Sequence, residues 1–438
     1  MDSTTSPQGL DHDRLAALQR ISFNYFLVEA NPANGLIADR THQGAPASIA
    51  AVGMALTAYP VAVARGFMTR SDACERTLKT LRFFWNSRQG PEKDATGYKG
   101  FYYHFLDMQT GHRVWKCELS TIDTALLMAG VLVAGAYFCE DGEEDTEIRQ
   151  LADALYRRVD WAWAQNGNAA VTLGWRPERG FLPYHWTGYD EALILYVLGL
   201  GSPTRPLSPE SYAAWLTGYR WKTLYGREFL YAGPLFIHQM SHIWIDFRGI
   251  QDAFMRERGS DYFENSRQAA YVQRQYAINN PRGFLGYHAN CWGLTASDGP
   301  GHGRGGHART VDGVQRRFYG YRARGVPFGP DDGTISPWAT VASLPFAPEI
   351  VLPALRHFHE IGLKDNHRYG FTASFNPTFA DEHGHPHGWQ SPDHVGINQG
   401  PIALMIENYR SDFIWKLMRG CPYIVAGLRR AGFSDGWL

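Results

Sequence analysis

The sequence is poor in cysteine, in net charge and in long apolar runs. Only 5 of its 438 residues are cysteines, and they are spread along the chain without a Cys-x-x-Cys pair. This pattern excludes a disulfide framework and a zinc site built from paired cysteines, and it indicates reduced thiols. The cysteines are Cys74, Cys117, Cys139, Cys291 and Cys421.

Charge and hydropathy exclude further classes of protein. The formal net charge is −1, which argues against nucleic acid or an anionic membrane surface as the main partner. No apolar run reaches the roughly 18 residues that a membrane-spanning helix needs. The first residues, Met-Asp-Ser-Thr-Thr-Ser-Pro, lack the basic and apolar regions of a signal peptide. We therefore expect a cytoplasmic protein, or a periplasmic one if a signal has been removed.

Aromatic residues, in contrast, are abundant. They make up 14% of the chain and include 14 Trp and 23 Tyr, while hydrophobic residues reach 44% and charged residues 19%. This balance is typical of an ordered globular protein. Flat aromatic faces with polar tips suit both a large core and stacking against sugar rings, and composition alone does not decide between the two.

Apolar periodicity predicts about a dozen helices joined by polar and aromatic loops. No strand–helix–strand alternation is present, so we predict an all-α fold, and the number and spacing of helices favour an alpha/alpha toroid. A short β-hairpin is expected from Tyr98 onward with its turn near 109–111, and a strand and turn at 171–186. We also expect a glycine-rich ordered insert at 281–345, short β-hairpins in the loops on the active-site face, and one domain over 1–438 with 1–10 as a flexible leader. The helices are predicted at 11–29, 47–65, 69–87, 121–138, 144–163, 192–198, 212–217, 235–256, 260–279, 348–363, 400–408 and 412–428.

Two predicted helix starts carry paired carboxylates. Ser120 suits the N-cap of the helix that follows it, and Asp123 completes a capping box in which Asp replaces Glu. The second start has the same order, with Asp190 and Glu191 before an apolar run. Glycoside hydrolysis needs two carboxyl groups, one protonated and one ionised. We therefore expect the two helix starts to face one cleft.

Their surroundings suggest a different role for each carboxyl group. The free N–H groups and the positive end of a helix favour the charged form at Asp123, which suits a general base. Glu191 lies next to Asp190 and before an apolar run, so burial and the like charge should raise its pKa, which suits a general acid. A structural alternative stays open, because Asp123 and Asp190 can also serve only as helix caps.

Further polar and aromatic residues recur in the connections and are candidates for contacting a substrate. Asp332 can instead belong to an ordinary Asp-Asp-Gly turn, and Glu407 can instead pair with Arg410 on its own helix. The four tryptophans among the candidates are predicted to be platforms for sugar rings. The candidates are Glu118, Asp190, Trp115, Trp186, His242, Asp246, Trp292, Asp298, Asp332, Trp338 and Glu407.

Motifs for other chemistry are weak. The run His383-Gly-His385-Pro-His387 has three alternating imidazoles, but its Gly and Pro spacers favour a surface turn, so no metal site is predicted. The glycine-rich run 299–306 lacks the strand before it and the Lys-Ser/Thr after it that a phosphate loop requires. No Gly-x-Ser-x-Gly elbow is present. An isomerase with paired histidine bases stays open, with four candidates: His104, His185, His238 and His242.

Seven ordered motifs resemble the glycoamylase-like family, which includes bacterial endo-β-1,2-glucanases of glycoside hydrolase family 144 and the related transglycosylating domain of cyclic β-1,2-glucan synthases. The resemblance extends over nearly the whole chain. The motifs lie at 118–130, 188–193, 242–249, 293–299, 332–337, 345–349 and 400–408.

The resemblance implies an (alpha/alpha)6 barrel, no cofactor, and an inverting glycoside hydrolase acting on β-1,2-glucan, either as an endo-enzyme or by releasing oligosaccharides. Asp123 and Glu191 match acidic residues that are essential in the family, with Glu191 as the acid. Asp123, and after it Asp332, is the expected base, acting directly or through a sugar hydroxyl or water. A transglycosylase and an inactive carbohydrate-binding protein are the alternatives. A glucan is the expected partner, and the chain is expected to be a monomer or weak homo-oligomer.

Overall fold

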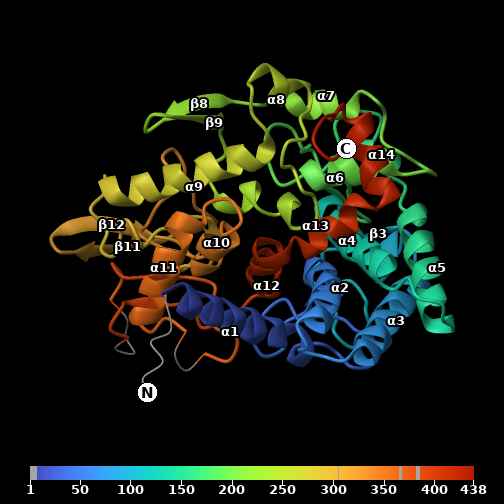
Figure 1. Cartoon of the computed structure of the whole chain (residues 1–438), viewed down its shortest axis with the longest axis horizontal. Helices are drawn as coiled ribbons and strands as arrows, with labels where there is room; N and C mark the ends of the chain where they lie inside the picture. The colour runs from blue at the N-terminus through green and yellow to red at the C-terminus, as the bar shows by residue number, and fades with distance from the viewer. Residues whose placement is uncertain (1–6, 304, 365–366, 381–384) are drawn as a thin grey trace. The chain divides into compact units, whose positions relative to one another are not determined.

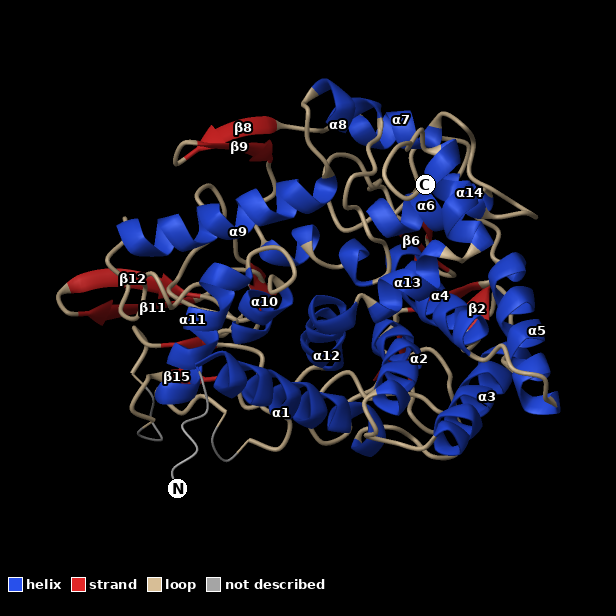
Figure 2. Cartoon of the chain, in the orientation of Figure 1, coloured by secondary structure: helices blue, strands red, loops and turns tan. Residues whose placement is uncertain are grey.

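The computed structural model describes residues 7–303, 305–364, 367–380 and 385–438 (Figure 1). Helices supply most of its regular structure, while the strands are short and antiparallel (Figure 2). The expectation of a helix-rich fold is therefore confirmed. Within the described ranges, no helix has both the length and the apolar character needed to cross a membrane.

The chain forms two compact units that alternate along the sequence. The first comprises the described residues up to Asn24, Trp221–Gln239 and Glu264–Arg410, and the second comprises Tyr25–Arg220, Met240–Phe263 and Ser411–Leu438. The expectation of a single domain stays a prediction.

Helices dominate the second unit, where α2 packs against α3 and α4, α4 against α5 and α6, and α14 against α6 (Figure 1). The helices of this unit are α2 (Ile49–Ala64), α3 (Arg70–Asn86), α4 (Thr121–Tyr137), α5 (Glu143–Arg158), α6 (Leu193–Gly201), α7 (Ser211–Leu216), α8 (Ala253–Glu257), α13 (Phe413–Arg419) and α14 (Pro422–Arg430), with the 3-10 turns η1 (Trp163–Gln165) and η3 (Ser241–Ile243).

A five-stranded antiparallel sheet of order β2-β3-β5-β6-β7 accompanies these helices. Its strand β5 leads directly into α4, so the sheet fixes where that helix begins. The predicted turn near 109–111 is found and is closed by a bridge between Leu106 and Arg113, and a second turn at Lys99 and Gly100 joins β2 to β3. The strand and turn predicted at 171–186 correspond to β6 and β7. The strands are β2 (Gly97–Tyr98), β3 (Phe101–Tyr103), β5 (Leu119–Ser120), β6 (Gly174–Arg176) and β7 (Gly180–Phe181); a separate pair joins β1 (Ala47–Ser48) to β4 (Phe105–Leu106).

The first unit combines long helices with four two-stranded hairpins or ribbons. It holds all or most of α1 (Pro7–Val28), α9 (Tyr262–Asn279), α10 (Pro337–Ala342), α11 (Pro348–Glu360), α12 (Gly396–Ser411) and the 3-10 turn η2 (Leu235–His238). Its paired strands are β8 (Trp221–Leu224) with β9 (Arg227–Leu230), β10 (Ala296–Ser297) with β13 (Arg322–Ala323), β11 (His307–Val311) with β12 (Val314–Phe318), and β14 (Phe375–Asn376) with β15 (Trp389–Gln390).

The helix predicted at 235–256 is wrong. That stretch forms η2, η3, a loop and the short helix α8. Gly249 takes a left-handed φ of 73°, which ends any continuous helix, and the Asp252 side chain accepts a hydrogen bond from the amide of Met255 and starts a new one. The apolar period of this stretch reflects core packing of loop residues, which periodicity alone does not distinguish from a helix.

Four other predictions about the bounds of segments also need correction. The helix predicted at 412–428 divides into α13 and α14, because Pro422 begins a new helix. The helix predicted at 144–163 ends at Arg158, and α10 lies unpredicted within the insert 281–345. Of the expected leader, residues 7–10 belong to α1 and residues 1–6 lie outside the described residues.

Helix α4 is the buried centre of the second unit, and its residues from Thr121 to Ala134 are all buried. The Ser120 hydroxyl accepts a hydrogen bond from the amide of Asp123 at 3.1 Å, which confirms Ser120 as the predicted N-cap. Helices α2 and α4 approach most closely at two glycines. A Cβ on Gly53 would lie 2.3 Å from the Leu126 carbonyl oxygen, and one on Gly130 would lie 2.1 Å from that of Gly53.

Gly53→Ala and Gly130→Ala should each lower the free energy of unfolding by about 1–3 kcal/mol, because the added methyl group forces α2 and α4 apart. Urea unfolding followed by circular dichroism measures the loss. Gly142→Ser is the control, since Gly142 is the N-cap of α5 and its Cβ would meet nothing within 4 Å. It should leave stability unchanged or raise it; equal losses in all three variants would contradict the close packing.

Candidate active site

Strand pairing in the second unit brings His104 beside Glu118. Tyr103 of β3 pairs with Leu119 of β5, and the amide of His104 donates to the carbonyl of Glu118 at 3.0 Å. The ring atom Nδ1 of His104 lies 3.0 Å from Oε1 of Glu118, and Nε2 lies 3.6 Å from Oδ2 of Asp123. The imidazole therefore bridges one carboxylate just before α4 and another in its first turn.

Other groups hold this bridge in place. Nη2 of Arg176, at the end of β6, lies 3.3 Å from Oε2 of Glu118. The hydroxyl of Ser120 donates to Oδ2 of Asp123 at 2.5 Å, so the same residue caps the helix and orients the carboxylate. The ring of Phe105 stacks on His104, with centroids 3.9 Å apart. The resulting order is Arg176, Glu118, His104 and Asp123, with alternating charge.

The second helix start differs from the first. α6 begins at Leu193, its N-cap is Ala192, and no side chain caps it. Instead, Oδ1 of Asp190 accepts from the amide of Ala192 at 2.9 Å and from Nε1 of Trp215 at 3.0 Å. The hydroxyl of Ser241 donates to the carbonyl oxygen of Glu191 at 3.4 Å. Asp190 is thus held by its neighbours, and within the described residues no hydrogen bond reaches the partly exposed Glu191 carboxyl group.

The environment of Glu191 keeps its carboxyl group protonated at neutral pH. Burial raises its pKa to about 8, the negative charges of Asp123 and Asp190 add to the rise, and the charge of His104 opposes it. Burial also raises the pKa of Asp190 to about 7, against the hydrogen bonds that it accepts. The rise in the pKa of Glu191 that the sequence predicts is therefore found.

Glu118 and His104 form an ion pair. The hydrogen bond from His104 lowers the pKa of Glu118 to about 2, although burial opposes this. Burial alone would lower the pKa of His104, but the Asp123 and Glu118 carboxylates raise it to about 9. The imidazole is therefore a cation at neutral pH and is unsuited to act as a base. His238, another base considered for an isomerase, lies in the first unit and is buried in a way that lowers its pKa to about 4.

Two of the predicted tryptophans keep exposed surface in the second unit. Trp115 is 69% exposed, has a left-handed φ of 55°, and its ring lies 5.2 Å from that of Phe105. Trp186 is half-buried and its Nε1 donates to Oγ1 of Thr121 at 3.0 Å, which places it at the start of α4. Both stay candidates for contacting a substrate.

His242 and Asp246 do not fit the predicted role in substrate binding. Each is only 1% exposed. The carbonyl of His242 accepts from Nε1 of Trp415 at 2.6 Å, and the Asp246 carboxylate is paired with Arg248 at 2.8 Å and with Arg419. Both residues therefore belong to the interior of the second unit.

Asp332 does not fit the role of general base either. Both it and Arg324 have fully buried side chains, and Nε of Arg324 donates to Oδ1 of Asp332 at 2.7 Å. Backbone amides of Tyr319 and Thr334 donate to the same carboxylate at 2.8 Å and 3.2 Å. A carboxylate saturated in this way has no accessible oxygen for water or sugar, so Asp332 is a structural anchor of the first unit.

Burial also corrects three further predictions in the first unit. Trp292 and Trp338 are 0% and 1% exposed, so neither offers a ring face to a sugar. Glu407 is 1% exposed and accepts from Nε2 of Gln19 at 2.8 Å, while Oε1 of Gln19 accepts from Arg410 at 2.8 Å. Gln19 thus forms one hydrogen bond to each of these two residues, and a direct pair between Glu407 and Arg410 stays a prediction.

Two predicted features of the first unit stay open or lie outside the structure. Asp298 is partly exposed, and its carbonyl accepts from Ser374 at 2.6 Å, so its substrate contact stays a prediction. In the run of alternating imidazoles, His383 lies outside the described residues.

Sequence reasoning missed Arg176, Ser241 and Trp215. None stands in a motif for glycoside hydrolysis, and each reaches the site through pairing or packing of distant segments. The alternation around Gly174–Arg176 indicated a strand, but its pairing partner cannot be predicted from alternation alone.

Comparisons with known proteins agree with the motifs. A family model described as "Glycoamylase: Putative glucoamylase" matches residues 183–422. The crystal structure of a "putative glucoamylase" from Bacteroides uniformis ATCC 8492 is 32% identical and covers 100% of both chains, with a TM-score of 0.85. An endo-β-1,2-glucanase from Chitinophaga pinensis, in complex with sophorotriose and glucose, is 27% identical and covers 98% of this chain and 99% of its own, with a TM-score of 0.84.

A longer relative is also similar. An exo β-1,2-glucooligosaccharide sophorohydrolase (non-reducing end) of Parabacteroides distasonis is 28% identical over 471 residues, which cover 98% of this chain and 59% of the relative. The chain thus spans about three fifths of that relative's length. Together the comparisons confirm the predicted family resemblance.

His104→Gln should destabilise the protein in a pH-dependent way. The pKa of His104 rises on folding from 6.5 to about 9, so its stabilisation is complete below 6.5 and is lost as the pH rises through 9. The pKa of Glu118 falls from 4.5 to about 2, so its contribution is complete above 4.5 and is lost toward 2. The variant should therefore lose about 1–3 kcal/mol near pH 5.5 and much less near pH 10, measured by urea unfolding.

His112→Gln, at an exposed histidine of the same unit, is the matched control and should change neither value. An equal loss for His104→Gln at both pH values would show that the ring acts by packing and not by charge.

Proposed function

The chain belongs to the glycoamylase family, and we propose that it is a glycoside hydrolase that cleaves β-1,2-glucan with inversion at the anomeric carbon. One observation carries this proposal: a protonated Glu191 and the Asp123 carboxylate interact electrostatically at two helix starts of the same unit. Inverting hydrolysis needs one carboxylic acid and one carboxylate that flank the scissile bond.

The names of two relatives support the choice of substrate. One is named an endo-β-1,2-glucanase and the other an exo-acting sophorohydrolase of β-1,2-glucooligosaccharides. The partner that we propose is therefore a β-1,2-linked polysaccharide or oligosaccharide. In keeping with the family resemblance, we also propose that the helices form an (alpha/alpha)6 barrel.

Glu191 acts as the general acid. Its raised pKa keeps a proton on the carboxyl group at neutral pH, and the group is partly exposed and free to approach a glycosidic oxygen. When the bond breaks, this proton passes to the leaving oxygen. The resulting Glu191 anion lies near Asp123 and Asp190, whose charges favour its reprotonation from solvent before the next turnover.

Asp123 acts as the general base. Ser120 donates to one of its oxygens and His104 lies next to the same oxygen, so the carboxylate is fixed in orientation. It receives the proton of the attacking water, either directly or through a sugar hydroxyl. The His104 cation is held by Glu118 and cannot compete for that proton.

Trp115 and Trp186 supply surfaces for sugar rings in this proposal. The exposed ring of Trp115 continues the row formed by His104 and Phe105, and the Trp186 ring is fastened to the start of α4. Trp186 thus lies at the helix start that carries the proposed base, and Trp115 is connected to that base through the rings of Phe105 and His104.

Glu191→Gln should reduce kcat on β-1,2-glucan by about 100-fold or more, because removal of a general acid typically costs 10²–10⁴ in rate. The same variant should unfold at a higher temperature near pH 8. The pKa of Glu191 rises on folding from 4.5 to about 8, so its ionisation in the unfolded chain disfavours folding as pH rises through that range, and Gln removes this penalty. Reducing-sugar release and thermal unfolding measure the two effects.

Glu210→Gln, at an exposed glutamate of the same unit, is the control and should change neither quantity.

Asp123→Asn should also abolish hydrolysis with little change in melting temperature, since Asn still accepts the Ser120 hydrogen bond. Residual activity together with a large fall in melting temperature would leave Asp123 as a helix cap only.

Proton NMR of early products from linear and cyclic β-1,2-glucan tests the stereochemistry, and a retained anomer or lengthened chains would favour the transglycosylase alternative.

A further inference from the structure

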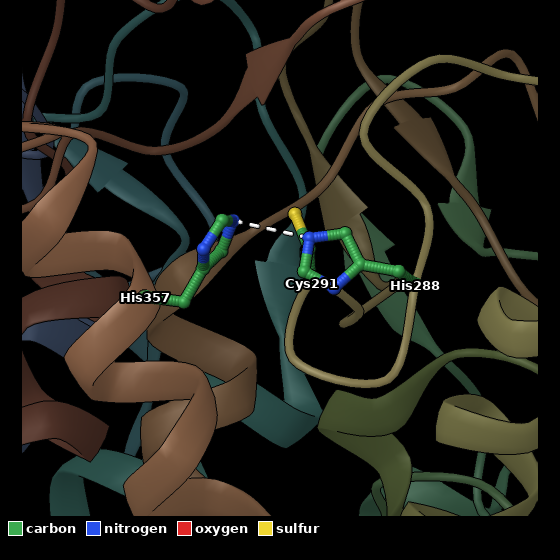
Figure 3. Close-up of side chains that lie close together, drawn as sticks. All are labelled: His288, Cys291 and His357. Atoms are coloured by element: carbon green, nitrogen blue, oxygen red, sulfur yellow. Dashed lines mark hydrogen bonds between the residues drawn. The ribbon is translucent and has the colours of Figure 1, made fainter.

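A loop and a helix of the first unit bring two histidines and a cysteine together. His288 and Cys291 lie in the loop after α9, and His357 lies on α11 (Figure 3). One possible ligand atom from each residue lies within 4.8 Å of the other two. Nε2 of His288 and Nε2 of His357 are 3.2 Å apart, and Figure 3 shows the sulfur of Cys291 beside this contact.

We propose that these three residues bind a transition-metal ion, with Zn²⁺ as the best match. Two imidazoles and one thiolate suit zinc, whereas Mg²⁺ and Ca²⁺ prefer oxygen ligands. This site is separate from the carboxylate cluster proposed for hydrolysis, which lies in the second unit. It therefore adds a metal-binding activity to the proposed function and does not depend on it.

The distances are close to those of a zinc site. Zn–N bonds of about 2.0–2.1 Å and Zn–S bonds of about 2.3 Å place tetrahedral ligand atoms roughly 3.3–3.6 Å apart. The two imidazole nitrogens, at 3.2 Å, are already near this separation. All three ligand atoms lie within 4.8 Å of one another, so a bound ion would draw the most distant pair together by up to about 1.5 Å. Three protein ligands leave a fourth position for water.

The turn that carries two of the ligands is already formed. The amide of His288 donates to the carbonyl of Cys291 at 3.3 Å, and the amide of Cys291 donates back at 3.0 Å. Nε of Arg274, on α9, donates to the carbonyl of Ala289 at 2.9 Å and fastens the turn to that helix. His-x-x-Cys on a tight turn has the spacing of paired zinc ligands.

The exposure of the two imidazoles gives the ion a path from solvent. His288 is exposed, His357 is half-buried and Cys291 is 1% exposed, so the thiol lies beneath two imidazoles that reach the surface. The third ligand comes from a different element, so a bound ion would connect the loop after α9 to α11. Such a connection forms only in the folded chain and therefore stabilises it.

Proton positions show what metal binding must displace. The amide of Asn290 donates to Nδ1 of His288 at 3.2 Å, which places the ring proton on Nε2, where it bridges to His357. The ion takes the place of this bridging proton, which moves to Nδ1 as the His288 ring turns away from Asn290. The Cys291 thiol releases its proton to water, and sulfur binds as the thiolate.

The test uses the full chain, freed of metal by a chelator and then titrated with Zn²⁺ or Co²⁺. We expect one equivalent of zinc by elemental analysis, a thiolate-to-cobalt charge-transfer band with Co²⁺, and a melting temperature raised by about 2–5 °C at saturating zinc. Cys291→Ala should lose the charge-transfer band. His288→Ala, at an exposed position that folding tolerates, should weaken zinc binding at least about tenfold.

Matched controls separate this site from adventitious binding. Cys139→Ala removes an exposed thiol and His112→Ala an exposed imidazole, both in the second unit, and both should bind zinc as the unaltered chain does. Binding of much less than one equivalent would overturn the proposal. So would one equivalent that His288→Ala binds as tightly as the unaltered chain.

Discussion

The ion pairs of His104 with Glu118 and Asp123 are the contacts on which the proposed active site depends. They form because β3 and β5 pair in one register and because β5 runs directly into α4. The imidazole fixes Asp123 in the first helical turn, and the close packing of α2 on α4 fixes that turn in the second unit. The position of the proposed base is therefore set by strand register and by a glycine contact between helices, neither of which touches a substrate.

The two proposed catalytic groups differ in what surrounds them. Asp123 accepts a hydrogen bond from Ser120 and lies next to a cation, so its charge is well supported. Glu191 has no such support among the described residues, and burial together with the charges of Asp123 and Asp190 keeps it protonated. The same carboxylate thus serves as the proposed base and helps to keep the acid in its reactive form, which is how one site maintains both protonation states at one pH.

Local rules predicted this part of the site well. The N-cap at Ser120, the buried helix after it and the raised pKa of Glu191 all depend on residues a few positions apart. Local rules failed where residues far away in the sequence decide the role of a side chain. From the sequence alone, Asp332 fits a turn residue or a base, but in the structure its carboxylate is paired with the buried Arg324. Trp292 and Trp338 are core residues because other parts of the chain pack around them. The proposed metal site was missed for the same reason, since His357 lies far from the His288–Cys291 turn in the sequence.

Direct titration of Glu191 tests the central claim, which is that Asp123 and burial hold this carboxyl group in its protonated form. The side-chain carboxyl group can be followed by carbon NMR of the protein labelled at glutamate, with Glu191→Gln identifying the signal. We expect a pKa of about 8 in the unaltered protein, and a lower value in Asp123→Asn because a nearby negative charge is gone. A pKa near 4.5, or one that Asp123→Asn leaves unchanged, would contradict the account.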